Sequence, residues 1–167
     1  PVDHSTARDG TWTPGPGDAL LKAIRAPKGK HLVAEDLGII PQSVLDLRDR
    51  HGLPGMAVLH FADEQPMNLH RPEHHTENTV VYTGTHDNDT TVGWGQRPLH
   101  DVLHDALASP ACLAVVPLQD VMGLGSEARM NTPGTMDGNW RWRFSWDDLN
   151  SPDVARFRAA VATHRPS

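Results

Sequence analysis

The chain has 167 residues, a formal net charge of −6 at pH 7, 38% hydrophobic residues and a single cysteine. This length predicts about one domain, which is large enough to bury a hydrophobic core. The acidic residues are scattered, and this argues against binding to a phosphate backbone, so we expect no nucleic acid partner. No run approaches the ~18 apolar residues of a spanning helix, so we expect no membrane partner either.

The single cysteine and the first residues bear on where the protein works. One cysteine excludes a disulfide framework, and the polar, proline-bearing start is unlike a signal peptide. We therefore expect a reducing compartment, the cytoplasm. Cys112 lies in the apolar run ACLAVV and is predicted to be a buried, small hydrophobic residue. Because the chain begins in a loop-like segment without a Met, we expect it to be part of a longer protein.

Helical and extended patterns alternate along the chain, with loops rich in Gly and Pro between them. Asp18 is predicted to cap the first helix, and Ser151 with Pro152 to begin the last. The extended segments are apolar throughout, as in parallel strands that are covered on both faces. The sequence therefore predicts an α/β chain, either a small doubly wound sheet or half of an eightfold barrel. The predicted helices span residues 18–26, 41–52, 98–109 and 151–164, and the predicted strands 31–34, 56–61, 79–84 and 111–118.

Polar residues gather at the carboxyl ends of three of these predicted strands. Glu35 and Asp36 follow the first strand, residues 86–89 (HDND) follow the third, and Gln119 and Asp120 follow the fourth. Parallel α/β folds build their sites at this edge of the sheet. One such cluster could be a helix cap, but three at one edge predict a functional site.

Paired carboxylates at such an edge are typical of glycoside chemistry. One carboxyl group must be protonated to donate to the leaving oxygen, while another stays charged. Glu35 and Asp87 follow different strands and could converge across the mouth of a barrel. Four tryptophans in the later loops could stack on the apolar faces of sugar rings, although core packing is the competing interpretation; they are Trp94, Trp140, Trp142 and Trp146.

Two other chemistries are compatible with the third cluster. His86, Asp87 and Asp89 could bind a divalent ion, but the His-x-His and Cys/His spacings of common metal sites are absent. Asp87 to Thr91 also fits the D-x-D-x-T nucleophile motif of haloacid-dehalogenase-type phosphatases. Those enzymes use a downstream lysine, whereas the last lysine here, Lys30, lies upstream. We therefore expect neither a metal nor another cofactor.

Four segments closely resemble a known family. They are VAEDLG (33–38), GLPGMAVLHFA (52–62), VVYTGTHDNDTTVGW (80–94) and PLQDVMGLGSEARMNTPGTMDGNWRWR (117–143), with GPGDALLKAI (15–24) in support. The family is that of the 4-α-glucanotransferases, also called amylomaltases or disproportionating enzymes, which are related to the α-amylases. The third and fourth segments are long, ordered and specific, and the resemblance spans nearly the whole chain.

The resemblance implies a (β/α)₈ barrel that transfers α-1,4-glucan segments with retention, with maltooligosaccharides as substrates. Residues 1–167 would form the second half of this barrel, strands five to eight and the closing helix. Glu35 matches the acid/base glutamate of the family, and Asp87 matches its transition-state-stabilising aspartate. Asp36 is as compatible with capping the next helix as with sugar binding. The other candidate sugar contacts are His86, Asp89, Gln119 and Asn131.

Two departures from the family pattern matter. The family's nucleophile segment, R-I-D-H-F-R-G, is missing, and Asp3 in PVDHS only imitates it, so we expect Asp3 to lie in a loop. The stretch between Trp94 and Ala114 is also short, by about one helix and its loop. We therefore expect the chain alone to lack transferase activity. The alternative is a vestigial carbohydrate-binding half-barrel, and unpaired barrel edges could make either form self-associate.

Overall fold

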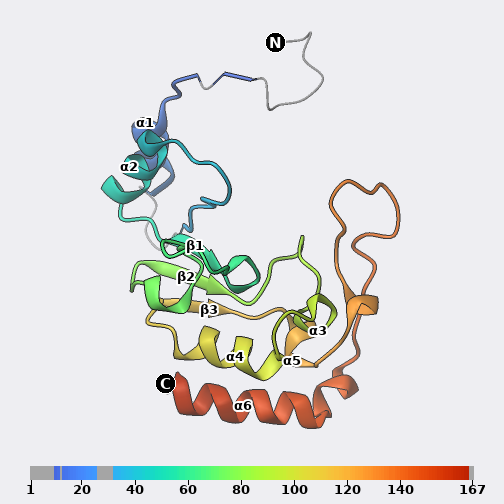
Figure 1. The fold of residues 1–167 in the computed structure, drawn as a ribbon. Coiled ribbons are helices and arrows are strands. Elements are labelled where there is room, and N and C mark those ends of the chain that lie inside the picture. The colour runs from blue at the N-terminus through green and yellow to red at the C-terminus, as the bar shows by residue number, and fades with distance from the viewer. Residues whose placement is uncertain (1–9, 12, 26–31, 166–167) are drawn as a thin grey trace.

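Three parallel strands form the sheet in the computed structural model, which describes residues 10–11, 13–25 and 32–165. The strands are β1 (Gly55–Val58), β2 (Thr79–Tyr82) and β3 (Leu113–Val115), and β2 lies between the other two (Figure 1). Ala57 and Ala114 pair with Val81 from its two sides. All three strands therefore end at the same edge, and the predicted α/β class is confirmed.

The helices match most of the predicted positions. Ser151 caps the last helix by accepting a hydrogen bond from the Val154 amide at 3.3 Å, as the sequence predicts. Two short helical turns, Thr91–Trp94 (α3) and Leu118–Val121 (α5), are additional to the four predicted helices. The α-helices are α1 (Gly17–Arg25), α2 (Gln42–Arg50), α3 (Thr91–Trp94), α4 (Leu99–Ala108), α5 (Leu118–Val121) and α6 (Pro152–His164), and the 3₁₀ turns are Leu59–Phe61, Pro72–His74, Ser126–Ala128 and Trp146–Asn150.

The hydrophobic core lies between the sheet and α4. Ala57 and Val81 of the sheet pack with Val102 and Ala106 of α4, and each is at most 1% exposed. In Figure 1, α4 runs beside β3 and α6 lies on the outer side of α4. Two helical layers, α4 and then α6, therefore cover this side of the sheet. The packing against α4 holds the strand ends in fixed positions.

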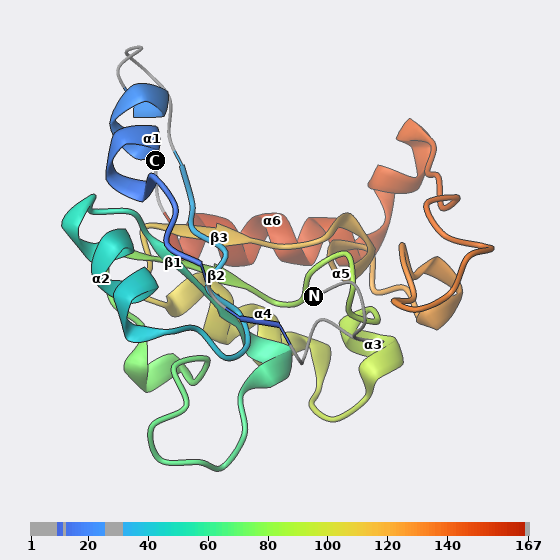
Figure 2. The same ribbon diagram turned by 90° about the horizontal axis from the view of Figure 1, so that it is seen from above.

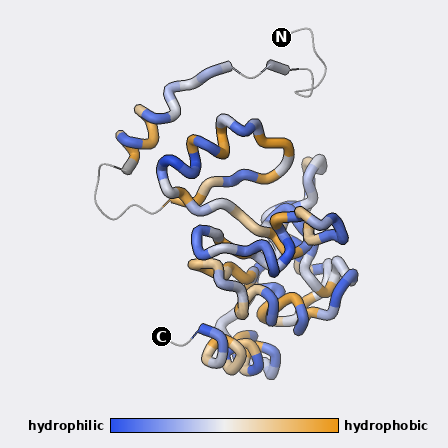
Figure 3. Tube along the Cα trace, turned by 60° about the vertical axis from the view of Figure 1, so that its left-hand side comes forward, coloured by the Kyte–Doolittle hydropathy of each residue, from blue (hydrophilic) through white to orange (hydrophobic). Residues whose placement is uncertain are grey.

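Helices α1 and α2 form a separate pair. Hydrophobic and hydrophilic residues alternate along α1 (Figure 3), and Leu20 remains 54% exposed. Asp18 lies inside the first turn of α1, rather than at the predicted N-cap, and contacts Arg50 and His51 near the end of α2. The hydrogen bond from His51 lowers the pKa of Asp18. Polar contacts therefore join α1 to α2.

The predicted strand at 31–34 does not form within the described residues. His31 lies outside them, and Ala34 makes a single ladder-like bond, from its amide to the Pro54 carbonyl at 2.9 Å. One bond fixes an extended segment next to β1, but it does not make a hydrogen-bonded strand. The strand predicted at 56–61 also ends early, because residues from Leu59 onward turn into a 3₁₀ helix.

The prediction for Cys112 is wrong. Its thiol is exposed and donates to the Thr79 carbonyl at 3.2 Å. Cys112 precedes β3, which is the last strand of the described sheet, and its neighbour Leu113 is 51% exposed. An apolar run on an edge strand stays open on one side, and this exposes residues that a central strand would bury.

None of the described helices is both long and apolar enough to cross a membrane.

Candidate functional site

A cleft of about 620 Å³ opens at the carboxyl ends of the three strands. Its walls come from the extended segment at residues 33–37 and from the loops that follow β2 and β3. Figure 2 shows these two loops on the same side of the molecule. Glu35 and Asp87 both line this cleft, so two of the predicted site residues from distant parts of the chain share one cavity.

The first polar pair divides between the cleft and the protein. Glu35 is exposed in the cleft and accepts no hydrogen bond from any residue that the structure describes. Asp36 instead accepts the Met56 amide at 2.8 Å and forms an ion pair with Arg48 of α2. Asp36 therefore ties the extended segment to β1 and α2. It does not cap α2, whose N-cap position is Pro41.

The second cluster presents one carboxylate to the cleft. Asp87 is half-exposed, and its Oδ1 accepts a hydrogen bond from the Asn131 amide group at 2.6 Å and lies 3.3 Å from His86 Nε2. Asn88 makes the local turn instead, since its side chain accepts from the Thr85 amide at 2.8 Å and from the Thr85 hydroxyl at 2.9 Å. A turn therefore accounts for Asn88, while Asp87 stays available to a ligand.

Asp89 points toward the protein, although it lies only two residues beyond Asp87. Its carboxylate accepts from the Ser126 hydroxyl at 2.8 Å and from the Thr90 amide at 2.8 Å, and it lies 3.8 Å from Arg129. Asp89 does not line the cleft. In a D-x-D-x-T phosphatase both aspartates would face the same cavity, so this geometry does not support that chemistry.

Arg129 fastens the two loops together, and its role was missed in the sequence. Its guanidinium donates to the carbonyls of Asp87 and Asn131, each at 2.8 Å, and it also approaches Asp89. These contacts join the loop after β2 to the loop after β3 and hold Asn131 beside the Asp87 carboxylate. The signal available in the sequence was that Arg129, a basic residue, lies two positions before Asn131, a predicted site residue.

The third pair is buried. Gln119 lines the cleft and donates to the Ala128 carbonyl at 3.2 Å. Asp120 is 1% exposed and accepts three hydrogen bonds, from the Thr83 hydroxyl at 2.6 Å, the Thr91 amide at 2.7 Å and the Thr91 hydroxyl at 2.8 Å. Asp120 thus fixes the floor beneath the cleft.

His60 continues this buried network from the end of β1. Because the Thr91 hydroxyl donates to Asp120, it must accept its hydrogen bond from His60 Nε2, which lies 3.0 Å away. The proton is therefore on Nε2, while Nδ1 is buried and has no hydrogen-bond partner among the residues that the structure describes. Burial lowers the pKa of His60 and favours the neutral ring. A Cβ at Gly84 would lie 2.9 Å from this ring, so the turn after β2 needs glycine.

Two aromatic residues also line the cleft. Trp140 adopts a positive φ of 62°, and its ring lies 5.2 Å from that of His86. Tyr82 ends β2, and burial raises the pKa of its phenol. Trp94, in contrast, stacks on His60 at 4.4 Å and packs against the core. The sequence suggested both roles for the tryptophans, and the structure separates them.

The described residues contain no group of three His, Cys, Asp or Glu side chains that could hold a metal ion. Asp3, which imitates the nucleophile of the family, lies outside the described residues. The cleft therefore presents two carboxylates, amide groups, an imidazole and aromatic rings. This set of groups suits a neutral ligand that carries many hydroxyl groups.

Comparison with known proteins identifies related sequences along the whole chain. A family model described as 4-alpha-glucanotransferase matches residues 1–101 and 95–149. The 4-alpha-glucanotransferase of Synechocystis is 45% identical over 90% of this chain and 34% of its own length. That of Thermus thermophilus is 43% identical over 99% of this chain and 39% of its own, and the potato (Solanum tuberosum) enzyme is 41% identical over 98% and 33%. The chain spans about a third of the length of these curated relatives.

A solved structure agrees with these sequence similarities. An amylomaltase from Streptococcus agalactiae, in complex with acarbose, superimposes with a TM-score of 0.84 at 30% identity and covers 97% of this chain and 37% of that one. The Thermus alignment extends over 195 positions, whereas this chain has 167 residues, so the relative carries residues that this chain lacks. The family match also breaks into two pieces at residues 95–101, within the stretch predicted to be short.

Proposed function

We propose that this chain, which belongs to the 4-alpha-glucanotransferase family, forms one wall of an active site that breaks and remakes α-1,4-glucosidic bonds. One observation carries the proposal: Glu35 and Asp87 line a single cleft at the carboxyl ends of parallel strands. In the complete barrel β1, β2 and β3 would be strands six to eight, and the extended segment before Asp36 would be the fifth. Acarbose in the Streptococcus relative supports an α-glucan as the ligand.

Glu35 is the proposed acid/base. In the first half of the reaction its carboxyl group protonates the departing 4-oxygen of the glucan. In the second half its carboxylate takes a proton from the incoming sugar hydroxyl, so the same group serves both transfers. Glu35 has the freedom that this role needs, because no described protein group holds its carboxylate.

Asp87 is the proposed stabiliser of the transition state. Its negative charge would lie close to the positive charge that develops on the sugar ring carbon and oxygen. The hydrogen bond from Asn131 and the backbone contact of Arg129 fix its position before the substrate arrives. His86 would bind a sugar hydroxyl beside it. Gln119, which also lines the cleft, would contribute its amide group to sugar binding.

The chain alone is proposed to bind glucan without turning it over. A retaining enzyme holds its nucleophile about 5–5.5 Å from the acid/base. The sequence contains no R-I-D-H-F-R-G segment to supply that nucleophile. Incubation with maltotriose should therefore release no glucose and form no longer maltodextrins. Robust disproportionation by the chain alone would contradict this assignment.

A chimera tests the proposed roles directly. Residues 32–165 would replace the corresponding part of the Thermus thermophilus relative, which aligns with 99% of this chain. We expect an active transferase that loses at least ~100-fold in rate on Glu35→Gln or Asp87→Asn. Glu64→Gln and Asp63→Asn are matched controls, because both carboxylates are exposed outside the cleft. A chimera that keeps full activity with Glu35→Gln would rule out the acid/base role.

A further inference from the structure

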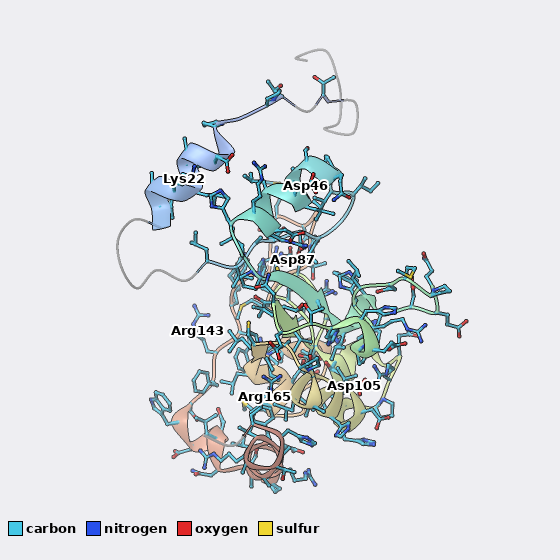
Figure 4. All side chains as sticks on the ribbon, turned by 90° about the vertical axis from the view of Figure 1, so that its left-hand side faces the viewer. Lys22, Asp46, Asp87, Asp105, Arg143 and Arg165 are labelled. Carbon is cyan, nitrogen blue, oxygen red and sulfur yellow. The ribbon has the colours of Figure 1, made fainter. Side chains whose placement is uncertain are left out.

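The segment WRWRFSW, residues 140–146, carries four aromatic side chains that the proposed reaction does not use. Three of them are exposed large hydrophobic residues: Trp140 at 54%, Phe144 at 40% and Trp146 at 79%. Arg141 and Arg143 alternate with the rings. Exposed aromatic residues at this density are typical of a binding surface. In Figure 4 Arg143 marks this segment, which leads to the C-terminal helix α6.

Trp140 places the first ring at the mouth of the cleft. A positive φ is unfavourable for a bulky residue and persists only when its surroundings fix it, commonly at functional sites. Here the Trp140 amide donates to the Met130 carbonyl at 2.7 Å, and the ring approaches that of His86 at 5.2 Å. His86 in turn lies 3.3 Å from the Asp87 carboxylate. The ring is therefore adjacent to the position proposed for the reacting sugar.

The other three rings continue away from the cleft in contact with one another. The ring centres of Trp142 and Phe144 are 5.9 Å apart, and those of Phe144 and Trp146 are 5.6 Å apart. Arg143 donates to the carbonyls of Trp140 and Trp142, at 3.1 and 2.7 Å, which fixes the backbone between the two parts. Rings held in this way lose little conformational freedom on binding.

We propose that Trp140, Trp142, Phe144 and Trp146 form an aromatic track for α-1,4-glucan chains that are too long for the cleft. This inference rests on the proposed function, because the track begins where the glucan would leave the cleft. The exposed rings of Trp140, Phe144 and Trp146 would pack their apolar faces on sugar rings, Trp142 would support Phe144 by stacking on it, and the exposed side chain of Arg141 could bind sugar hydroxyl groups. The continuity with the cleft, through His86 and Trp140, favours a glucan over a protein partner.

The test compares two probes of different length, maltotriose and maltoheptaose, by titration of the ¹⁵N-labelled chain in two-dimensional NMR. The indole N–H signals report each tryptophan separately. We expect both probes to shift the Trp140 signal and only maltoheptaose to shift those of Trp142 and Trp146. The Trp94 signal should not shift, because its ring is covered by His60. Maltoheptaose should bind about tenfold more tightly than maltotriose.

Variants separate the track from the cleft. Trp146→Ala and Phe144→Ala should each weaken maltoheptaose binding about fivefold and leave maltotriose binding unchanged, while Trp146→Phe should restore most of the loss. Phe61→Ala is the matched control, since Phe61 is 41% exposed but lies outside the cleft and the track. Trp146 is 79% exposed and is not part of the hydrophobic core cluster, so its removal leaves the core intact.

Equal affinities for the two probes, unchanged by Trp146→Ala, would overturn the track and leave the proposed function standing. Failure of both probes to bind would overturn both proposals. A fivefold loss of maltotriose binding in Trp146→Ala would also contradict the track, because it would mean that Trp146 acts on the cleft itself.

Discussion

The carboxylates at the sheet edge fall into two groups, those that face the cleft and those that bind protein groups. Glu35 and Asp87 face the cleft, Asp87 with Asn131 and His86 beside it, whereas Asp36 and Asp120 are held by protein groups. The first two could act on a ligand, and the latter two fix the segments that carry them. Carboxylates that lie one residue apart, or at the same edge of the sheet, therefore differ in which protein groups donate hydrogen bonds to them.

This division explains how a site can be both exposed and rigid. Asp120 joins Thr83 at the end of β2 to Thr91 at the start of α3, and His60 adds the end of β1. The loop that carries Asp87 thus begins and ends on a buried network. Arg129 fastens the same loop from the other side. Glu35 and Asp87 can face the cleft in fixed positions because the neighbouring carboxylates anchor the segments that carry them.

The largest expected effect is on folding, from the loss of Asp120. Asp120→Ala leaves the Thr83 and Thr91 hydroxyls and the Thr91 amide without their acceptor in a buried site. Breaking one side of such a network should lower the free energy of unfolding by about 3–5 kcal/mol. Urea unfolding measures it. Asp87→Ala is the matched control and should change stability by less than about 0.5 kcal/mol. Equal losses in the two variants would erase the distinction between these carboxylates.

The next effect comes from Asp36. Asp36→Ala removes the acceptor for the Met56 amide and the partner of Arg48. Because this site is only partly buried, we expect a loss of about 2 kcal/mol. Glu35→Ala, one residue earlier, should leave the unfolding midpoint in urea nearly unchanged. A stable Asp36→Ala protein that had lost acarbose binding would instead assign Asp36 to the ligand.

A smaller effect concerns the ligand. Asp87→Ala should weaken acarbose binding to the chain about tenfold, since a hydrogen bond to a charged group is lost, while the fold is retained. Calorimetric titration measures the affinity. Asp63→Ala, which removes an exposed carboxylate outside the cleft, should leave the affinity unchanged. An unchanged acarbose affinity in Asp87→Ala would mean that the ligand does not bind beside Asp87 in the cleft.

The smallest effect is on the pH dependence of stability. Burial lowers the pKa of His60, His70 and His75 below the usual 6.5. In the unfolded chain these imidazoles bind protons at a higher pH than in the folded chain. The stability that their neutral forms contribute is therefore complete above about pH 6.5 and is lost as the pH falls below that value. We expect the free energy of unfolding to drop by about 1 kcal/mol between pH 7.5 and 5.5. His75→Asn should flatten this slope, and His100→Asn, at an exposed position, should not. A wild-type stability that is flat over this range would contradict the prediction.

Much of this could be predicted from the sequence, because the order of elements follows local patterns. The α/β class, the cap at Ser151 and the polar clusters after the strands need only neighbouring residues. The inward or outward direction of each carboxylate could not be predicted, since Asp36 is fixed by Arg48 and Asp120 by Thr83, which lies 37 residues away. Cys112 was misjudged for the same reason, because exposure at a sheet edge depends on which strands pair.

Glu35 and Asp87 are proposed to form one wall of a glucan site. A crystal structure of the chain with acarbose tests it most directly. We expect a sugar ring of acarbose in the cleft, within hydrogen-bond distance of both carboxylates and near His86, with Asp36 and Asp120 keeping their protein partners. Acarbose bound away from the cleft, or in the cleft without contact to Glu35 and Asp87, would contradict it.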